Sequence, residues 1–448
     1  MKAPICDFVK KYCADGALRL HMPGHKGVGF LGIEERDITE VEGADVLYSA
    51  GNGVIAESER NATLLFGSRR TLYSTEGSSL GIRAMMYLCL LHARESGREA
   101  VVLAARNAHK AFLSAVALLD LQVEWMYSDR NDGVVSCRIT PQALEKKLSS
   151  MPKMPSAVYI TSPDYLGYEA DIKGIAEVCH RYGVILAVDN AHGAYLRFLP
   201  ESRHPLDLGA DICCDSAHKT LPVLTGGAYL HVSNDAPLLF SEMAEQAMQL
   251  FASTSPSYLI LQSLDMANLY IADGYKGKLA ELCDEIKSLK QGLVEKGFEI
   301  IGDESTKLTV ATKSYGYYGY ELAELLLKKG IVSEFSDRDY TVMMFTPEVD
   351  KGGIQRLFEA LCSIEKRKAI IEGTPSAAEA ERAMSVRQAL MERSREVLVD
   401  EALGEILASA SVSCPPAIPI VVCGERIDGQ AIACFKYYGV EKCRVVKK

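Results

Sequence analysis

The sequence predicts an α/β protein with a mostly parallel sheet, and two features support this fold class. Short apolar runs rich in β-branched residues recur along the chain, at 100–105, 156–161, 183–189 and 209–215. Segments with helical periodicity lie before and between these runs, at 78–95, 108–119 and 171–182. Strands that are apolar on both faces and alternate with helices are typical of a parallel sheet covered by helices on both sides.

The other segments follow in chain order. Residues 1–60 are rich in glycine and mixed polar residues, and we expect an N-terminal arm there. The alternating strands and helices indicate a large domain over 61–297. A smaller α/β domain is expected over 298–448, where strand-like runs (FEIIG, LTVAT, IVSEF and TVMMFT) follow a long helical pattern. That helix is expected at about 275–296, further helices at about 319–329 and 376–407, and a short strand at 418–422.

Composition restricts the class of function. The chain has 448 residues, 48% hydrophobic and 24% charged, enough for two or three globular domains. A net charge of −10 argues against a nucleic-acid partner, because such proteins need a basic face. The thirteen cysteines include no Cys-x-x-Cys pair, so we expect buried reduced thiols and no metal site. The N-terminus lacks the apolar core of a signal peptide, and prolines interrupt the uncharged stretch Ile406–Gly424, so we expect a cytoplasmic protein without membrane contact.

Residues just after the four predicted strands are the first candidates for a site, because open parallel sheets bind ligands beyond the carboxyl ends of their strands. Lys219 follows the last of these strands, in DSAHKTLPVLTGG. Most lysines are solvated surface residues, but one held in such a pocket has a lowered pKa and can form a Schiff base. Asp189 ends the preceding strand, 30 residues earlier. It is either a helix cap or the carboxylate that keeps a pyridine nitrogen protonated.

Two further strand ends or helix starts carry polar residues. Gly77, Ser78 and Ser79 precede an apolar helical run, where backbone amides and hydroxyls can bind phosphate or simply cap the helix. His109 follows the strand at 100–105 and could stack on a flat cofactor, although a capping role is the ordinary one. The order glycine-serine turn, histidine, aspartate, then serine-x-histidine-lysine is that of a pyridoxal phosphate (PLP) enzyme of fold type I.

The chain resembles the ornithine/lysine/arginine decarboxylase family in its short form. The motifs that carry this resemblance cover nearly the whole chain: LHMPGHKG (20–27), DITEVEGADVLYSAGNGVIAESE (37–59), ITSPDYLGYEADI (160–172), VDNAHGAY (188–195), SAHKTLP (216–222) and PPAIPIVVCGERI (415–427). The pair SAHKTLP and VDNAHGAY is the most specific. The resemblance implies an aspartate-aminotransferase-like large domain and a smaller C-terminal domain.

The resemblance also implies roles for individual residues. Lys219 would bind PLP covalently, Asp189 would pair with its pyridinium nitrogen, and His218 would touch the phosphate or relay a proton. The phosphate would be held by Gly77, Ser78, Ser79 and Ser216. Ala191 and His109 would lie against the two ring faces, with His192 and Thr161 lining the pocket. The candidates for substrate contact are His25, Glu334, Asp337 and Glu425.

The implied reaction is decarboxylation of arginine, lysine or ornithine by at least a homodimer, with the arm around His21–Gly27 reaching the neighbouring site. Two alternatives stay open. One is an aminotransferase or another lyase on the same fold, which would anchor the substrate carboxylate with an arginine such as Arg338 or Arg356. The other is a silent regulatory protein. The chain departs from the family pattern at three places, which are Glu76, Gly226-Gly227 and Cys423.

Overall fold

The computed structural model describes residues 1–49, 51–128, 133–375, 379–410 and 418–447. Its largest sheet has seven strands in the order β1-β7-β6-β5-β4-β2-β3. Their bounds are β1 Arg70–Ser74, β2 Val101–Ala105, β3 Gln122–Met126, β4 Ala157–Thr161, β5 Ile185–Asp189, β6 Ile212–Asp215 and β7 Ala228–Val232. The pairs from β3 to β6 are parallel, and β7 runs antiparallel to both β6 and β1. The predicted α/β class with a mostly parallel sheet is confirmed.

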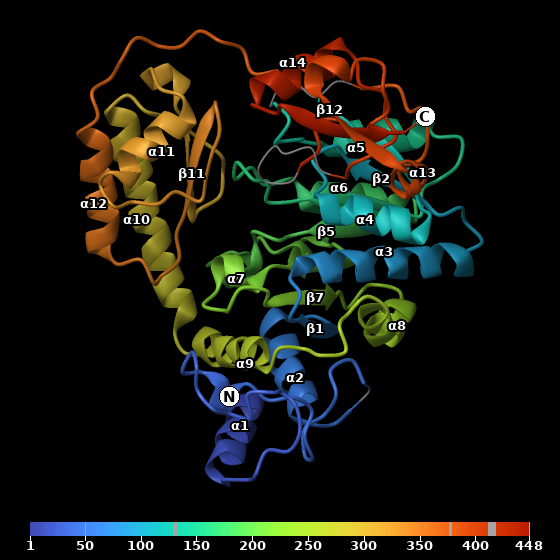
Figure 1. Cartoon of the computed structure of the whole chain (residues 1–448), viewed down its shortest axis with the longest axis vertical. Coiled ribbons are helices and arrows are strands. Elements are labelled where there is room, and N and C mark those ends of the chain that lie inside the picture. Colours follow the sequence, from blue (N-terminus) through green and yellow to red (C-terminus); the bar gives the residue numbers. More distant parts are fainter. Residues whose placement is uncertain (50, 129–132, 376–378, 411–417, 448) are drawn as a thin grey trace.

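Helices cover both faces of this sheet (Figure 1). One face packs against α3 (Ser78–Glu95), α4 (Lys110–Leu119) and α8 (Leu238–Gln249), and the other against α5 (Pro141–Ser150) and α6 (Ile172–Arg181). Alternate residues of each central strand enter the two cores. In β5, Ala187 faces the first group of helices, whereas Leu186 and Val188 face the second. This two-sided burial explains why the central strands are continuous apolar runs.

A second sheet stands beside the first, on the left in Figure 1. It is antiparallel in the order β10-β11-β9-β8, with β8 at Glu299–Ile301, β9 at Lys307–Ala311, β10 at Phe335–Ser336 and β11 at Tyr340–Met344. It packs with the long helix α10 (Tyr275–Glu295) and with α11 (Gly319–Leu327) and α12 (Lys351–Cys362) around a core of its own. We call this unit the second lobe.

The last part of the chain contains a two-stranded antiparallel sheet, and here two predictions are wrong. The segment expected as one helix over 376–407 holds the short helix α13 (Val386–Met391) and the strand β12 (Ser394–Leu398); residues 376–378 lie outside the described residues. The partner of β12 is β13 (Lys442–Val446), which follows α14 (Gly429–Tyr437). Residues 418–422, expected as a strand, form none. Residues 415–417 of the C-terminal motif lie outside the described residues.

The N-terminal region is more structured than an arm. It contains α1 (Pro4–Ala14), which packs on α2 (Val54–Phe66) and α9 (Tyr258–Ala272). Between α1 and α2 lies an exposed apolar segment with Leu18, Leu20, Met22, Val28, Phe30 and Leu31. The remaining short helices are α7 (Ala217–Thr220) and the 3-10 turns Glu34–Arg36, Ala194–Phe198, Pro205–Leu208, Lys313–Tyr315 and Val399–Glu401. Among the described residues, no helix is long and apolar enough to span a membrane, and the cysteines are all free.

Candidate active site

A cavity of about 290 Å³ opens at the carboxyl ends of β4, β5 and β6, where the start of α3 and the second lobe also meet. Its lining consists of Gly77, Ser78, Ser79, Asn107, His109, Thr161, Pro163, Tyr165, Asp189, Ala191, His192, Ser216, His218, Lys219, Glu334 and Ile418. The structure therefore brings together all the residues for which cofactor contact was predicted. Four of the lining residues were missed by the sequence analysis, namely Asn107, Pro163, Tyr165 and Ile418.

Lys219 lies on the single turn α7, directly after β6. Its Nζ is 3.1 Å from Nε2 of His192, and no other hydrogen bond of this atom is seen among the described residues. Burial lowers the pKa of Lys219 and so does the nearby Lys307, whereas Asp189 acts in the opposite direction. An amine with a lowered pKa is a better nucleophile at neutral pH. The geometry of α7 thus presents a reactive lysine to the cavity.

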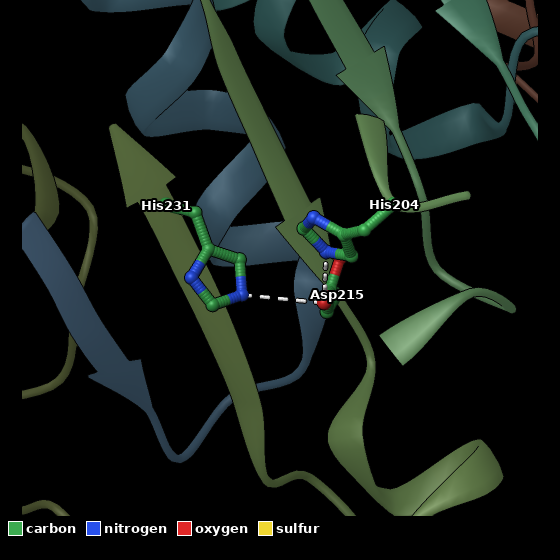
Figure 2. A group of neighbouring side chains, drawn as sticks. All are labelled: His204, Asp215 and His231. Carbon is green, nitrogen blue, oxygen red and sulfur yellow. Dashed lines mark hydrogen bonds and ion pairs between the residues drawn. The ribbon is translucent and has the colours of Figure 1, made fainter. Parts of the chain in front are cut away.

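Behind this turn, a buried carboxylate holds the end of β6 in place (Figure 2). Oδ2 of Asp215 lies 3.0 Å from Nε2 of His204 and 3.2 Å from Nε2 of His231, and all three side chains are fully buried. Asn190 donates to the other carboxylate oxygen at 2.7 Å. Burial by itself would raise the pKa of Asp215, but the two histidines outweigh it and hold this pKa below its usual range. We call these residues the Asp215 cluster.

The Asp215 cluster was not foreseen from the sequence. Its three candidate ligand atoms lie within 4.8 Å of one another, the composition of a possible metal site. Both Nε2 atoms already face the carboxylate, however, and Thr71 Oγ1 lies 2.8 Å from Nδ1 of His231. The cluster is therefore explained by its own hydrogen bonds, and it fixes the position of the turn that carries Lys219.

Asp189 projects from the end of β5 and is 2% exposed. Tyr159 donates its hydroxyl to Oδ2 at 3.0 Å, and the backbone N–H of Ala191 donates to Oδ1 at 3.2 Å. These bonds fix the carboxylate at the cavity wall, where Ala191 and His192 follow it in the same turn. A buried carboxylate held in this way is suited to a cationic ring nitrogen.

The start of α3 forms the opposite end of the cavity. Gly77 has a φ of 72°, which favours glycine, and its N–H donates to the carbonyl of Gly226 at 2.7 Å. Ser216 donates to Ser78 Oγ at 2.8 Å, so hydroxyls from two elements meet at this helix N-terminus. Glu76 accepts a hydrogen bond from the backbone N–H of Ser253 at 2.7 Å. Its carboxylate is thus held outside the cavity, as the predicted phosphate site requires.

Gly226, one of the departures from the family pattern, belongs to this arrangement. Its φ of 100° favours glycine, and a Cβ atom at this position would lie only 2.9 Å from the carbonyl oxygen of Thr75. Only glycine therefore fits here. The carbonyl oxygen of Gly227 lies 2.9 Å from Nδ1 of the His218 ring and accepts the backbone N–H of His218 at 3.1 Å. The two glycines therefore allow the turn before β7 to approach both the start of α3 and the turn of Lys219.

His109 and Asn107 line the side of the cavity next to β2. His109 caps α4, because its Nδ1 accepts the N–H of Ala111 at 3.1 Å, and burial lowers the pKa of its imidazole. The capping role and a position beside a flat ligand are thus compatible. Asn107 Oδ1 and Thr161 Oγ1 are buried at the cavity and find no hydrogen-bond partner among the described residues. Unpaired polar atoms of this kind fit a polar ligand such as PLP.

The mouth of the cavity is formed partly by the second lobe. Glu334 is exposed there and accepts a hydrogen bond from the hydroxyl of Tyr165 at 3.1 Å. The ring of Tyr165 packs edge-on against His192, with 5.1 Å between ring centroids. Ile418 contributes the apolar part of the rim. Glu334 is the only one of the four predicted substrate residues that lines this cavity in the described part of the chain.

The other three predicted substrate residues are held elsewhere. Glu425 is buried 3.3 Å from Arg106 and accepts the N–H of Val422 at 2.7 Å, so it fastens the C-terminal segment to the large sheet. His25 lies 3.2 Å from Asp37 within the N-terminal region. Neither side chain lines the cavity of this chain.

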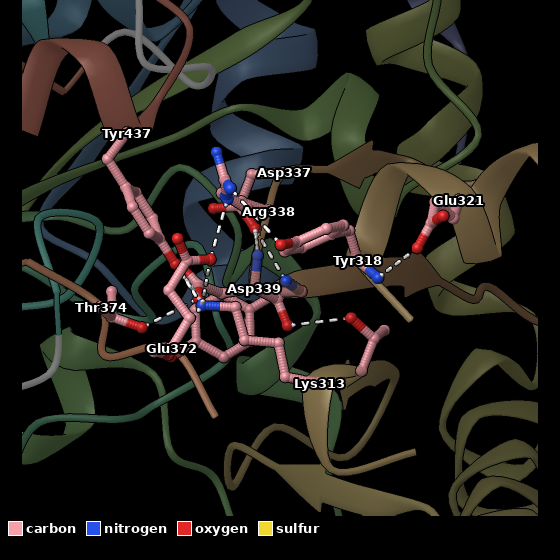
Figure 3. A network of polar contacts seen from close by, with 11 residues as sticks. Lys313, Tyr318, Glu321, Asp337, Arg338, Asp339, Glu372, Thr374 and Tyr437 are labelled. Atoms are coloured by element: carbon pink, nitrogen blue, oxygen red, sulfur yellow. Dashed lines mark hydrogen bonds and ion pairs between the residues drawn. The ribbon is translucent and has the colours of Figure 1, made fainter. Parts of the chain in front are cut away.

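Asp337 lies in a polar network between the second lobe and α14 (Figure 3). It accepts the N–H groups of Asp339 and Tyr340 at 2.7 Å each, and burial raises its pKa to about 7. Asp339 in turn accepts from Tyr437 and pairs with Lys313, both at 2.6 Å. The predicted contact between Asp337 and a substrate is therefore replaced by a turn-forming role.

Comparison with known proteins identifies the family. The model of the Orn/Lys/Arg decarboxylase major domain matches residues 3–302, and that of the Orn/Lys/Arg decarboxylase C-terminal domain matches residues 366–442. The chain belongs to this family. It is therefore a PLP-dependent amino-acid decarboxylase, and the resemblance noted from the motifs is confirmed.

Two bacterial relatives match nearly the whole of this decarboxylase. It is 29% identical to the uncharacterized protein YaaO of Bacillus subtilis, over 96% of this chain and 93% of the relative. It is 28% identical to the arginine decarboxylase of the same organism, over 96% and 92% of the two chains. The solved structure of lysine decarboxylase A from Pseudomonas aeruginosa superposes with a TM-score of 0.79, 17% identity, and coverage of 99% of this chain and 80% of that one. This last likeness shows the fold alone.

Proposed function

We propose that the protein decarboxylates a basic L-amino acid, namely arginine, lysine or ornithine, to the corresponding amine and carbon dioxide. The observation that carries this proposal is the combination of Lys219 and Asp189 at adjacent strand ends with the carboxylate of Glu334 at the mouth. The first two residues suit the cofactor, and the third suits a cationic side chain that enters from solvent.

The residues that would hold PLP surround the cavity on three sides. Lys219 would bind it covalently and Asp189 would face its ring nitrogen. Ser78, Ser79 and Ser216 would receive the phosphate at the start of α3, where the helix N-terminus favours an anion. Ala191 and His109 would cover the ring faces. When bound there, PLP supplies the electron sink that decarboxylation requires.

The chain's own residues would then orient the substrate and handle protons. Glu334 would attract the ammonium or guanidinium group, with Tyr165 fixing the carboxylate by its hydrogen bond. His192 lies beside Lys219 Nζ, where it can hold or release a proton. His218 has a pKa lowered by burial and is a second candidate for proton transfer. Ile418 would help exclude water at the rim.

Transamination is the competing reaction, and the positions of two arginines disfavour it. An aminotransferase needs a guanidinium in the site that anchors the substrate carboxylate. Arg338 pairs with Glu372 at 3.0 Å, and Arg356 donates to the carbonyls of Lys329 and Gly330. Among the described residues, no arginine lines the cavity. The substrate carboxylate would thus stay free to leave.

We also propose a homodimer with the exposed apolar segment between α1 and α2 at its interface. Six large apolar side chains of this segment are between 63% and 83% exposed. Large apolar side chains exposed within one short segment are typical of an interaction surface. Deletion of residues 1–27 should abolish dimer formation in sedimentation experiments; a truncated protein that stays dimeric would contradict this assignment.

Mass analysis of the products tests the proposed reaction. The purified protein is incubated with PLP and separately with L-arginine, L-lysine and L-ornithine. One dominant amine (agmatine, cadaverine or putrescine) is expected, with an equal amount of carbon dioxide. A keto acid without carbon dioxide would instead indicate transamination and overturn the proposal.

A further inference from the structure

A second lysine reaches the active site from the second lobe. Lys307 is the first residue of β9, its side chain is 1% exposed, and its Nζ lies 3.5 Å from Nδ1 of His192. His192 therefore stands between two lysine amines, because its other ring nitrogen faces Lys219 at 3.1 Å. No motif in the sequence indicated Lys307. The decarboxylation proposed above assigns it no role.

The surroundings of Lys307 define its charge state and the direction of its hydrogen bonds. Its Nζ pairs with Oε2 of Glu304 at 2.7 Å and donates to the carbonyl of Asp164 at 3.3 Å. With Nδ1 of His192, the Nζ of Lys307 has three polar neighbours, of which one is an ion-pair partner and two can accept its hydrogen bonds. These neighbours suit a donor, and Glu304 supplies the opposite charge that a buried ammonium group needs.

This arrangement determines which nitrogen of His192 carries the proton. An ammonium group can only donate, so Nδ1 must accept from Lys307. In a neutral imidazole the proton then resides on Nε2, which faces Nζ of Lys219. A proton on Nε2 requires an acceptor opposite it. The neutral amine of Lys219 has a lone pair for this bond, whereas its ammonium form has none.

We propose that Lys307 is a positioning residue that fixes the Nε2–H tautomer of His192 and thereby holds Lys219 as the neutral amine. The inference rests on the proposed function only in taking Lys219 as the lysine that binds the cofactor. His192 then carries its proton on Nε2. Lys307 of the second lobe thereby controls the charge of Lys219, the nucleophile of the large domain. The 3.5 Å separation places the two atoms at the long end of the hydrogen-bond range.

The pKa shifts agree with this geometry. Burial lowers the pKa of His192 well below its usual value, and the neighbouring lysines lower it further, so the ring stays neutral. Burial and Lys307 lower the pKa of Lys219, against the effect of Asp189. The titratable and charged groups around the two residues are Lys307, Asp189, Glu334, Cys214, His109, His218 and Tyr165.

The apparent pKa of Lys219 in the full-length protein without cofactor is the direct test. Competitive acetylation between pH 6 and pH 11, followed by peptide mass spectrometry, reports the reactivity of each lysine. In the Lys307→Met variant, the charge that lowers the pKa is lost and Nε2 of His192 becomes free to accept. Both changes raise the apparent pKa of Lys219, by about one unit, which is about tenfold slower labelling below that pKa.

Lys290→Met is the matched control. Lys290 donates to the backbone carbonyl of the same Glu304 at 2.7 Å but does not contact His192. This variant should leave the pKa of Lys219 unchanged. Should Lys307→Met fail to fold because Glu304 loses its partner, the double variant Lys307→Met/Glu304→Gln removes both charges together and should show the same rise.

A folded variant without Lys307 whose Lys219 keeps the wild-type pKa would overturn the inference. The inference would also be overturned if Lys290→Met raised the pKa of Lys219 equally, because loss of any nearby positive charge would then explain the shift. A combination with His192→Phe sharpens the test, since most of the effect of Lys307→Met should disappear when the imidazole is absent. None of these readouts uses substrate. If the product assay fails while Lys307→Met raises the pKa of Lys219, the proposed function is rejected and this inference stays intact.

Discussion

Two buried histidine clusters flank the turn that carries Lys219, and their charges are arranged in opposite ways. Behind the turn, the carboxylate of Asp215 lies between two imidazoles that donate to it. In front of the turn, the imidazole of His192 lies between the amines of Lys219 and Lys307. The same residue type therefore serves once as a donor to an anion and once as a bridge between two lysine nitrogens.

The different charges around the two clusters give them different roles. A buried carboxylate whose two neighbours both donate to it is a satisfied arrangement that resists change, so the Asp215 cluster is an anchor. An imidazole between two lysines can be satisfied only if one amine is neutral. The cluster around His192 is therefore poised for proton transfer. We expect changes behind the turn to alter stability, and changes in front of it to alter reactivity.

Replacement of Lys219 by alanine should have the largest effect. Turnover should fall on the order of 10³-fold or more, because the covalent attachment and a proton-holding group are both lost. Steady-state assays with the preferred amino acid measure this. The matched control is Lys290→Ala, a half-buried lysine outside the cavity, which should keep near wild-type activity. Substantial turnover by the Lys219→Ala variant would place the chemistry elsewhere.

Loss of Asp215 should chiefly affect stability. Asp215→Ala leaves two buried imidazoles without an acceptor and should reduce the free energy of unfolding by about 3–5 kcal/mol. Asp215→Asn keeps one acceptor oxygen and should cost about 1–3 kcal/mol. Urea denaturation at fixed protein concentration measures both. If either variant instead kept its stability and shifted the pKa of Lys219, the division between anchor and reactive cluster would be wrong.

The pH dependence of stability separates the clusters further. Because the pKa of Asp215 is lower in the folded protein than in the unfolded chain, its stabilisation is fully present above the unfolded pKa of about 4. It is lost as the pH falls through the lower folded pKa. The stability difference between wild type and Asp215→Asn should thus shrink as the pH falls below about 4. A difference that grows on acidification below about pH 4 would contradict this assignment.

Glu334→Gln should produce the smallest effect. Its carboxylate is exposed, so its attraction for a cationic side chain is screened by water. The KM for the preferred basic amino acid should rise about two- to fivefold, with kcat nearly unchanged. Glu299→Gln, an exposed carboxylate on β8 of the same lobe, is the control and should leave KM unaltered. A large fall in kcat would mean that Glu334 acts in the chemistry.

The part of the site on the large sheet could be predicted from the sequence, for a physical reason. Carboxyl ends of adjacent parallel strands meet at one edge, so residues after consecutive apolar runs converge. Asp189, Lys219, His109 and the start of α3 are positioned by this rule. Lys307 obeys no such rule, because the docking of the second lobe brings it in. A buried lysine in a short strand carries no local signal.

The contacts of carboxylates near the C-terminal motif were the hardest to predict from the sequence. Glu425 was expected at the substrate, but its buried pairing with Arg106 depends on a contact between residues far apart in sequence. The wrong helix over 376–407 has a similar cause. Its glutamate, arginine, alanine and leucine residues favour a helix locally, yet pairing with β13 draws Ser394–Leu398 into a strand. Long-range pairing overrides local preference in both cases.

Chemical trapping of the cofactor tests the central claim most directly, because Lys219 and Lys307 both lie beside His192 and only Lys219 is assigned to PLP. The loaded enzyme is reduced with borohydride, digested and mapped by mass spectrometry. The reduced cofactor should be found on Lys219, and the amount there should fall when the preferred amino acid is added before reduction. Label on Lys307, or label on Lys219 that substrate never displaces, would contradict the account.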